Sequence, residues 1–267
     1  MSMDLRVGFI GGGAMAEAIV AGITQGTVSR ESIYVSDHKA ARCQQLAEQY
    51  GIHASVGADS FLGHVDVLFL AVKPQFYEDV ILSIRDHVKK DALIVTLAPG
   101  KTLEWLGSLF GEDRKIIRTM PNTPAMVGEG MTAVCPNHSV TDEELDTVLT
   151  LLSSFGQAEV IPENLIDVAT AVSGSSPAYI FLAIEAMADG AVADGMPRNK
   201  AYRFAAQAVL GSAKMVLETG KHPGELKDMV CSPGGTTMEA VRVLEEKGLR
   251  SALIEAEKAC VRKARAM

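Results

Sequence analysis

The sequence predicts an α/β protein, in which a doubly wound parallel sheet precedes a smaller, all-helical C-terminal domain. A glycine-rich turn joins a short apolar strand to a helix within residues 7–18. Apolar runs then alternate with helical patterns, which is the βαβ rhythm of a parallel sheet. After about Glu163, runs of β-branched residues almost disappear and helical periodicity continues to the C-terminus. We therefore expect two domains, at residues 1–163 and 164–267.

The N-terminal part is expected to form one sheet with helices between its strands. The run at 65–72 is apolar throughout, as is typical of a strand buried on both faces. The expected strands are 7–10, 32–36, 51–53, 65–72, 92–97 and 115–119, with 132–135 and 158–161 closing the sheet. The expected helices run from the glycine-rich turn to about residue 25 and over 39–50, 76–88 and 142–155.

The C-terminal part is expected to be helical at 164–173, 177–194, 198–218, 223–230, 236–247 and 249–263. Small residues recur along one stripe of the second of these helices, at Ala183, Ala186, Gly190 and Ala193, where another helix can approach closely. So apolar a helix needs cover on nearly every side. It is either a deep helix of the chain's own core or part of an interface between two subunits, and we favour the interface.

Composition excludes several classes of protein. The formal charge of −8, with no Lys/Arg-rich face, argues against nucleic acid as a partner. The four cysteines are far apart and the six histidines are scattered, so we expect reduced thiols and no metal site. No basic-then-apolar leader opens the chain, and the apolar segment 178–192 is too short to span a bilayer. We expect a cytoplasmic protein that does not contact a membrane.

The glycine-rich turn has the order of residues that a dinucleotide site needs. Gly11 permits a tight turn, Gly13 lets a pyrophosphate approach the backbone, and Ala16 lets the helix pack closely. The phosphates would then bind free amides at the positive end of the helix dipole. Because a strand precedes this turn and a helix follows it, we expect a dinucleotide cofactor.

The end of the second strand should meet the ribose of that cofactor. Asp37 lies where an acidic residue binds a ribose 2′-hydroxyl and favours NAD. Ser36, His38, Lys39 and Arg42 surround it with donors that could instead hold a 2′-phosphate. Ser36 and Asp37 could also be no more than a helix cap. The residues themselves leave the choice between NAD(H) and NADP(H) open.

Three later strands end in further candidates. Lys73 could reach a phosphate or be a solvated loop lysine, and Ala98 could face the nicotinamide. The amide of Asn122 could bind a carboxamide or the neighbouring main chain, and a purely structural turn is equally open. The expected cofactor-binding residues are Ile10, Gly11, Gly13, Ala14, Met15, Ser36, Asp37, Ala71, Val72, Lys73, Pro74, Ala98 and Asn122.

Two loops in the helical part are expected to offer amides and hydroxyls at helix N-termini. They are 173–177 and 231–237, and together they suggest a substrate that carries a carboxylate. No Lys, Arg or His occurs between Leu165 and Pro197, so this stretch lacks the proton donor that a hydroxyacid dehydrogenase needs. A protonated cyclic imine fits such a site, because its carbon is already electrophilic.

Five segments resemble the Δ1-pyrroline-5-carboxylate reductase family over nearly the whole chain. They are FIGGGAMAEAI, VDVLFLAVKPQ, MPNTPAMVGEGMTA, AVSGSSPAYIFLAIEAMADGAVADGMPR and HPGELKDMVCSPGGTTMEAVRVLE. The resemblance implies a Rossmann domain, an interlocked homodimer built by the helical domain, and commonly a decamer of five dimers. It also implies reduction of the C=N bond of pyrroline-5-carboxylate to L-proline by NAD(P)H, with NADP(H) favoured and NAD(H) possible.

The resemblance further implies a substrate site. Val230, Thr236 and Thr237 would hold the carboxylate, with Glu163 near the ring. The expected substrate residues are Glu163, Ser175, Val230, Ser232, Gly234, Gly235, Thr236 and Thr237, of which Thr237 is the catalytic candidate that orients the ring nitrogen. The alternatives are a neighbouring enzyme acting on a hydroxyacid, a ketoacid or another cyclic imine, and a dinucleotide sensor without activity.

Overall fold

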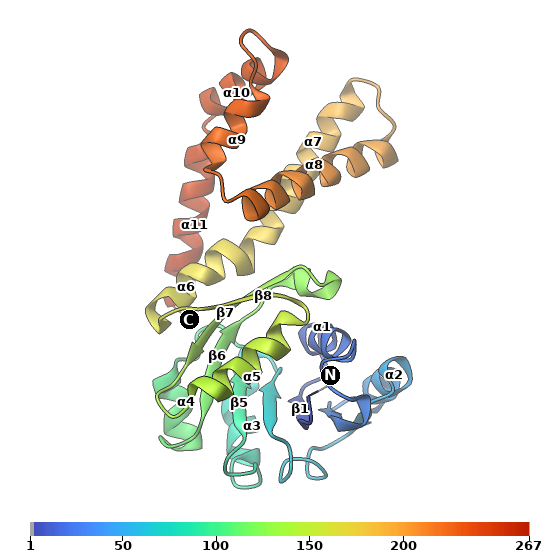
Figure 1. Cartoon of the computed structure of the whole chain (residues 1–267), viewed down its shortest axis with the longest axis vertical. Helices are drawn as coiled ribbons and strands as arrows, with labels where there is room; N and C mark the ends of the chain where they lie inside the picture. Colours follow the sequence, from blue (N-terminus) through green and yellow to red (C-terminus); the bar gives the residue numbers. More distant parts are fainter. Residues whose placement is uncertain (1–2, 267) are drawn as a thin grey trace. The chain divides into compact units, whose positions relative to one another are not determined.

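The computed structural model describes residues 3–266, whose contacts form two compact units (Figure 1). The sheet unit comprises the residues up to Ser175 together with those from Cys260 onward, and the helical unit runs from Ser176 to Ala259. This division lies later in the chain than the domain boundary expected after Glu163. Ile166, beyond that boundary, is buried in one cluster with Ala133 and Cys135 of the sheet.

The sheet unit is built on an eight-stranded sheet with the order β3-β2-β1-β4-β5-β6-β7-β8. Neighbouring strands from β3 to β6 pair in parallel, and the direction of winding reverses at β1, between β2 and β4. In a doubly wound sheet, ligands bind at the carboxyl edge beside such a reversal. The strands are β1 (Val7–Ile10), β2 (Ile33–Ser36), β3 (His53–Ser55), β4 (Val67–Leu70), β5 (Leu93–Thr96), β6 (Ile116–Met120), β7 (Gly130–Pro136) and β8 (Gly156–Val160).

All the expected strands are present, with small shifts at their ends, and the sheet is mostly parallel as predicted. One pairing departs from the pattern, because β7 runs antiparallel to β6. Only the short helical turn η3 (Thr123–Val127) lies between these two strands, whereas a parallel connection needs a crossover of a dozen or more residues. β8 then pairs in parallel with β7 after the helix α5 (Asp142–Ser153).

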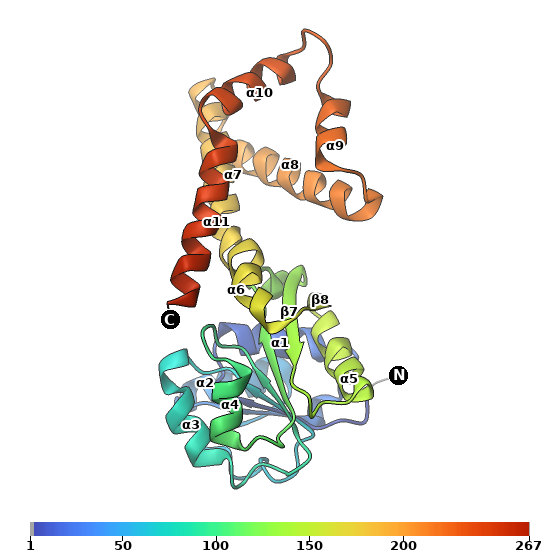
Figure 2. The ribbon, with the colours of Figure 1, turned by 90° about the vertical axis from the view of Figure 1, so that its left-hand side faces the viewer.

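Helices cover both faces of the sheet and bury two apolar layers (Figure 1 and Figure 2). One layer holds α1 (Ala14–Ile23), α2 (Ala40–Tyr50) and α5, and the other holds α3 (Tyr77–Ile84) and α4 (Leu103–Phe110). The helix α4 is not among the helices expected from the sequence. Its signals are the N-cap of Thr102, which accepts the Trp105 N–H, and the burial of Leu106 and Phe110 on one face.

The residues between the sheet and the helical unit are helical throughout. They form η4 (Glu163–Leu165), α6 (Ile166–Ala169) and a π-helical turn, Thr170–Ser175. The expected loop at 173–177 is therefore wrong, and it offers no helix N-terminus to an anion. The side chains of Thr170 and Ser173 bond back to the carbonyls of Ile166 and Ala169, which keeps these small polar residues in the helix.

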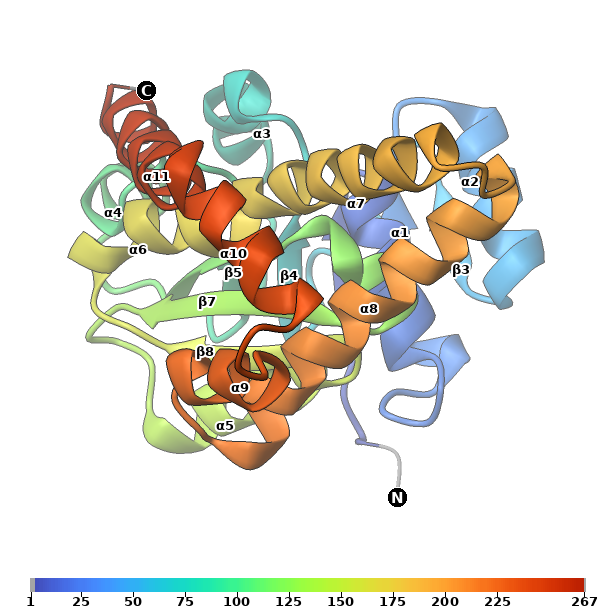
Figure 3. The same cartoon turned by 90° about the horizontal axis from the view of Figure 1, so that it is seen from above.

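The helical unit contains α7 (Ser176–Ala193), α8 (Arg198–Thr219), α9 (Pro223–Val230), α10 (Thr236–Glu246) and most of α11 (Leu249–Arg265). Figure 3 shows α7 and α8 side by side. Among the described residues of these helices, only Ala188, Ala201 and Ala205 are buried. The explanation of 177–194 as a deep core helix of the single chain is therefore wrong.

The apolar side chains of α7 and α8 are instead exposed in the single chain. Phe181 is 63% exposed, Phe204 68% and Leu217 81%. The helical segment Glu163–Ala193 has 31 residues and contains an 18-residue window with a mean hydropathy of 1.3, so by length and composition alone it could cross a membrane. The apolar segment 178–192 is thus part of a longer helix than the sequence predicted, and the expectation that it is too short to span a bilayer is wrong. So much apolar surface indicates cover from another molecule.

Candidate functional site

The glycine-rich turn lies where β1 ends, and its geometry requires glycine. Gly11 has φ +98°, and a Cβ atom there would lie 2.7 Å from the Ala71 carbonyl oxygen. The Gly11 N–H donates to the Ser36 carbonyl at 2.7 Å, and the Ala71 N–H donates to the Ile10 carbonyl at 2.8 Å. These bonds hold the turn against the ends of β2 and β4.

The N-terminus of α1 has the properties of an anion site. Gly13 is its N-cap, and none of the described side chains caps it. A Cβ atom at Gly13 would meet nothing within 4 Å, so the backbone there faces open space. The first-turn N–H groups, at Ala14 and Met15, have no carbonyl partner within the helix. The donor set and the open approach fit the pyrophosphate of a dinucleotide.

The carboxyl edge of the sheet brings most of the expected cofactor residues together. The strand registers align Ile10 with Ser36 and with Leu70. Leu70 in turn aligns with Thr96, two residues before the buried Ala98. The segment Ala71–Pro74 follows β4 at this edge. The strands on either side of β1, across which a dinucleotide must lie, therefore end at the same level.

Asp37 is held firmly at the end of β2. Its Oδ2 accepts the Gly12 N–H and its Oδ1 accepts the Lys39 N–H, each at 2.9 Å. The imidazole Nδ1 of His38 lies 3.2 Å from Oδ1. The N-cap of α2 is Lys39 and not Asp37, so a helix cap does not account for this carboxylate. Asp37 thus ties the end of β2 to the glycine-rich turn.

Arg42 is occupied by neighbours of the same turn. Its Nε donates to the Gly12 carbonyl at 2.6 Å, and its Nη2 donates to Glu17 at 2.6 Å. The Tyr50 hydroxyl donates to the other oxygen of Glu17 at 3.1 Å. The hydrogen bond from Arg42 is the largest effect that holds the pKa of Glu17 below its usual value. This cluster fastens α2 to the start of α1.

Tyr77 is a residue of this site that the sequence reading missed. Its side chain is fully buried, and its hydroxyl donates to the Leu70 carbonyl at 2.6 Å and accepts the Leu97 N–H at 3.0 Å. Burial raises the pKa of the Tyr77 hydroxyl well above its usual value, so it stays a neutral donor. Tyr77 therefore fixes the ends of β4 and β5, directly before Ala71 and Ala98. The only sequence signal was a tyrosine at the start of an apolar helix.

The amide of Asn122 is engaged by main chain. Its Nδ2 donates to the Ser173 carbonyl at 3.0 Å, and its Oδ1 accepts the Met131 N–H at 2.9 Å. The residue is 8% exposed. Both polar atoms of this side chain thus have main-chain partners, as a purely structural role of Asn122 in the turn requires. Lys73 is exposed, which is compatible both with a lysine that reaches a phosphate and with a solvated loop lysine.

Glu163 forms an ion pair within the sheet unit. Its Oε1 accepts from the buried Arg118 at 2.9 Å and from the Leu103 N–H at 2.7 Å. Asp167 lies 3.8 Å from the same guanidinium. These contacts fasten the start of the helical segment to β6 and α4, which the sequence reading did not foresee.

The segment 231–237 forms the expected turn before α10. Gly234 has φ +69°, and the Gly235 N–H donates to the Ser232 carbonyl at 3.0 Å. The positive φ of Gly234 favours glycine at that position of the turn. Gly235 is the N-cap of α10 and no described side chain caps it. The amides that follow, beginning at Thr236, can bind a carboxylate.

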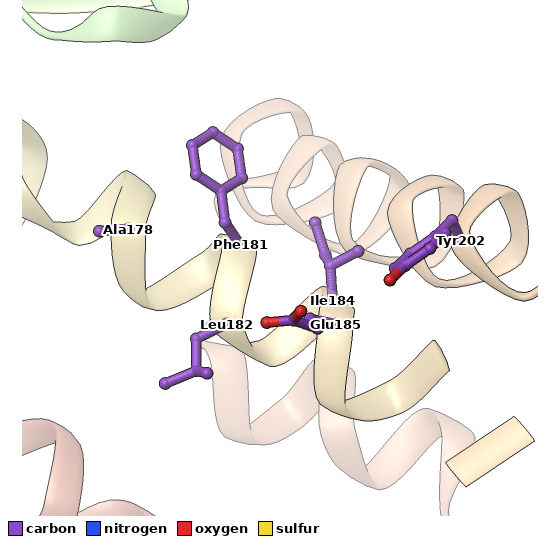
Figure 4. Close-up of a pocket in the computed structure, with 6 residues that line it drawn as sticks. All are labelled: Ala178, Phe181, Leu182, Ile184, Glu185 and Tyr202. Atoms are coloured by element: carbon purple, nitrogen blue, oxygen red, sulfur yellow. The ribbon is translucent and has the colours of Figure 1, made fainter. Parts of the chain in front are cut away.

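The helical unit has an open hollow with a mostly apolar lining. Figure 4 shows an open hollow between α7 and α8 whose lining carries one charged group, the carboxylate of Glu185; the lining residues are Ala178, Phe181, Leu182, Ile184, Glu185 and Tyr202. It offers no cation to a phosphate or carboxylate and belongs to the exposed apolar surface of the helical unit. Within residues 3–266, no group of three His, Cys, Asp or Glu residues could hold a metal ion.

The sheet, the turn and the open helix terminus define a Rossmann-type dinucleotide-binding unit. Residues 6–100 match the family model described as NADP oxidoreductase coenzyme F420-dependent. Residues 163–267 match the model described as pyrroline-5-carboxylate reductase dimerisation. Together they identify an oxidoreductase that uses NAD(P)H and forms oligomers.

The chain belongs to the pyrroline-5-carboxylate reductase family. It is 54% identical over 98% of its length to the pyrroline-5-carboxylate reductase of Escherichia coli, covering 97% of that protein. It is 42% identical to the Methanosarcina acetivorans reductase, over 94% of this chain and 93% of that protein.

Solved structures agree with this assignment. The pyrroline-5-carboxylate reductase of Coxiella burnetii matches with a TM-score of 0.93 and 33% identity, over 99% of this chain and 98% of that one. The pyrroline carboxylate reductase of Plasmodium falciparum, solved with NADP bound, matches with a TM-score of 0.88 and 28% identity, over 100% of this chain and 99% of that one.

Proposed function

We propose that this protein reduces L-Δ1-pyrroline-5-carboxylate to L-proline with NAD(P)H, the final step of proline biosynthesis. The observation that carries the proposal is 54% identity to the Escherichia coli reductase over 98% of the chain. Two separate donor sets support it, the glycine-rich turn before α1 and the Gly234–Gly235 turn before α10. A dinucleotide sensor would need only the first.

In the cofactor site, the amides that begin α1 hold the pyrophosphate and Asp37 faces the ribose. Ala71–Pro74 and Ala98 line the nicotinamide side, where Tyr77 fixes the backbone. When bound, the dihydronicotinamide supplies a hydride, which adds to C5 of the imine while the ring nitrogen carries the proton. The chain's contribution is to position the reactants within roughly 3–3.5 Å of each other.

In the substrate site, the amides and hydroxyls of Thr236 and Thr237 bind the carboxylate, beside Val230. Thr237 is the group that orients the ring nitrogen: its hydroxyl oxygen accepts the N–H of the protonated imine, and it acts through orientation and electrostatics. A role for Glu163 and Ser175 rests on the family resemblance. Glu163 is bound by Arg118, and the Ser175 hydroxyl oxygen accepts the Cys260 thiol at 3.2 Å.

We also propose a homodimer formed through the helical unit, and a decamer of five such dimers. The exposed apolar side chains of α7 and α8 and the match to a dimerisation family support the dimer. The decamer rests on the family resemblance. The four free cysteines suit a reducing compartment, which supports a cytoplasmic location. We propose that neither nucleic acid nor membrane is a partner.

The experiment that tests the reaction is oxidation of NADPH, and separately of NADH, on addition of pyrroline-5-carboxylate to the purified protein. We expect rapid oxidation of at least one cofactor and formation of proline. The control replaces the substrate with proline alone. Folded protein that binds a cofactor but turns over neither would contradict the proposed function.

A further inference from the structure

The ribose end of the cofactor site carries a negative charge that cannot easily move. The side chain of Asp37 is 12% exposed, and main-chain N–H groups hold both of its oxygens. One of these donors is Gly12, a buried residue of the glycine-rich turn itself. Rotating the carboxylate away would leave that buried N–H without its acceptor, which is costly. The charge therefore has a fixed place relative to the pyrophosphate turn.

The guanidinium best suited to a 2′-phosphate is already committed. Arg42 donates to the Gly12 carbonyl, to Glu17 and to Gln45, at 2.6, 2.6 and 2.9 Å. Turning it toward a phosphate would break these bonds and leave the half-buried Glu17 without its ion pair with Arg42. The other nearby basic side chains are weaker candidates. His38 is 81% exposed and lies against Asp37, and Lys39 is exposed, so solvent screens both.

NADH and NADPH differ at this end in a single group. NADH presents a 2′-hydroxyl, which can donate a hydrogen bond to a carboxylate, whereas NADPH presents a phosphate with close to two negative charges. A fixed carboxylate accepts a hydrogen bond from the 2′-hydroxyl but repels the 2′-phosphate, because juxtaposed like charges are strongly unfavourable.

We infer that Asp37 makes this protein bind NAD(H) in preference to NADP(H), in contrast to the NADP(H) that the family resemblance favours and that the Plasmodium falciparum relative binds. The inference rests on the proposed function, because it assigns the cofactor preference of the same site. Asp37 accepts the ribose hydroxyl, the glycine-rich turn holds its carboxylate in place, and Arg42 serves the protein's own structure.

The test measures binding, so that it does not depend on turnover. Titration calorimetry on the full-length protein gives Kd for NADH and NADPH, and for adenosine 5′-monophosphate and adenosine 2′,5′-bisphosphate, which differ only in the 2′-phosphate. We expect NADH to bind at least about tenfold more tightly than NADPH, equivalent to about 1.4 kcal/mol. Asp37→Asn, which removes the charge but keeps an acceptor, should reduce that ratio at least about tenfold.

The matched control is Asp91→Asn. Asp91 is an exposed carboxylate in the turn before β5, at the opposite edge of the sheet, and its loss should leave the ratio unchanged. Asp37→Ser provides a second variant if Asp37→Asn does not fold. NADPH binding as tightly as NADH in the unmodified protein, or an unchanged ratio in a folded Asp37 variant, would overturn the inference. If either result were found while pyrroline-5-carboxylate was still reduced, the proposed function would stand without the inferred cofactor preference. If no nucleotide bound to the folded protein, the proposed function and the inference would both be overturned.

Discussion

Replacing Tyr77 with Phe should loosen the cofactor edge without touching the cofactor. The change removes one oxygen atom and leaves two main-chain groups, the Leu70 carbonyl and the Leu97 N–H, without that partner. A buried polar group that loses its partner costs about 1–3 kcal/mol, and Leu70 is fully buried. We expect the free energy of unfolding of the sheet unit to fall by about 1–3 kcal/mol in urea titrations.

Steady-state kinetics of the same variant separate a positioning role from a merely structural one. Because Ala71 and Ala98 follow the two loosened groups, KM for the nicotinamide cofactor should rise more than KM for the imine. Tyr34→Phe is the matched control, since Tyr34 contacts His53 and Phe61 through its ring. Full stability with unchanged cofactor affinity in Tyr77→Phe would refute the reasoning.

Three further predictions concern other parts of the molecule. Thr237→Ala should raise KM for the imine about fivefold or more, from the loss of roughly 1 kcal/mol of hydrogen bonding, and change KM for the cofactor little; equal effects would contradict its assignment. The pKa of Glu17 is lowered in the folded protein from 4.5. Its ion pair with Arg42 therefore stabilises the fold above pH 4.5 and is lost as the pH falls toward the folded pKa, so acid titrations should show a smaller loss of stability in Glu17→Gln. Phe181→Glu places a charge on the exposed apolar face of α7 and should shift sedimentation toward smaller species; an unchanged oligomer would place the interface elsewhere.

Local patterns account for what the sequence predicted well. The β1 strand, Gly11 and the start of α1 follow from residues within one turn of each other, so strand, turn and helix could be predicted together. The turn at Gly234–Gly235 is equally local. Conversely, Tyr77 acts through Leu97, whose position depends on the pairing of β4 with β5. No periodicity reveals such a partner.

Two errors have a different cause. The helix α4 has only eight residues and contains Gly107, so its pattern was too short and too weak to stand out. The sequence of the π-helical turn predicts a loop, because serine and glycine are typical of loops. There Thr170 and Ser173 bond to their own helix, and Gly174 fits beside Met120, where a Cβ atom would lie 3.1 Å from the methionine methyl carbon.

The scarcity of buried side chains in the helical unit has a consequence for how the protein reaches its native state. A chain segment with three buried alanines in its helices has little interior of its own to offset the entropy of ordering its backbone. We therefore expect folding of the helical unit and association of subunits to form a single equilibrium, whose midpoint temperature rises with the total concentration of chains. Dilution alone should unfold the helical unit while the sheet unit, with two buried layers of its own, remains intact.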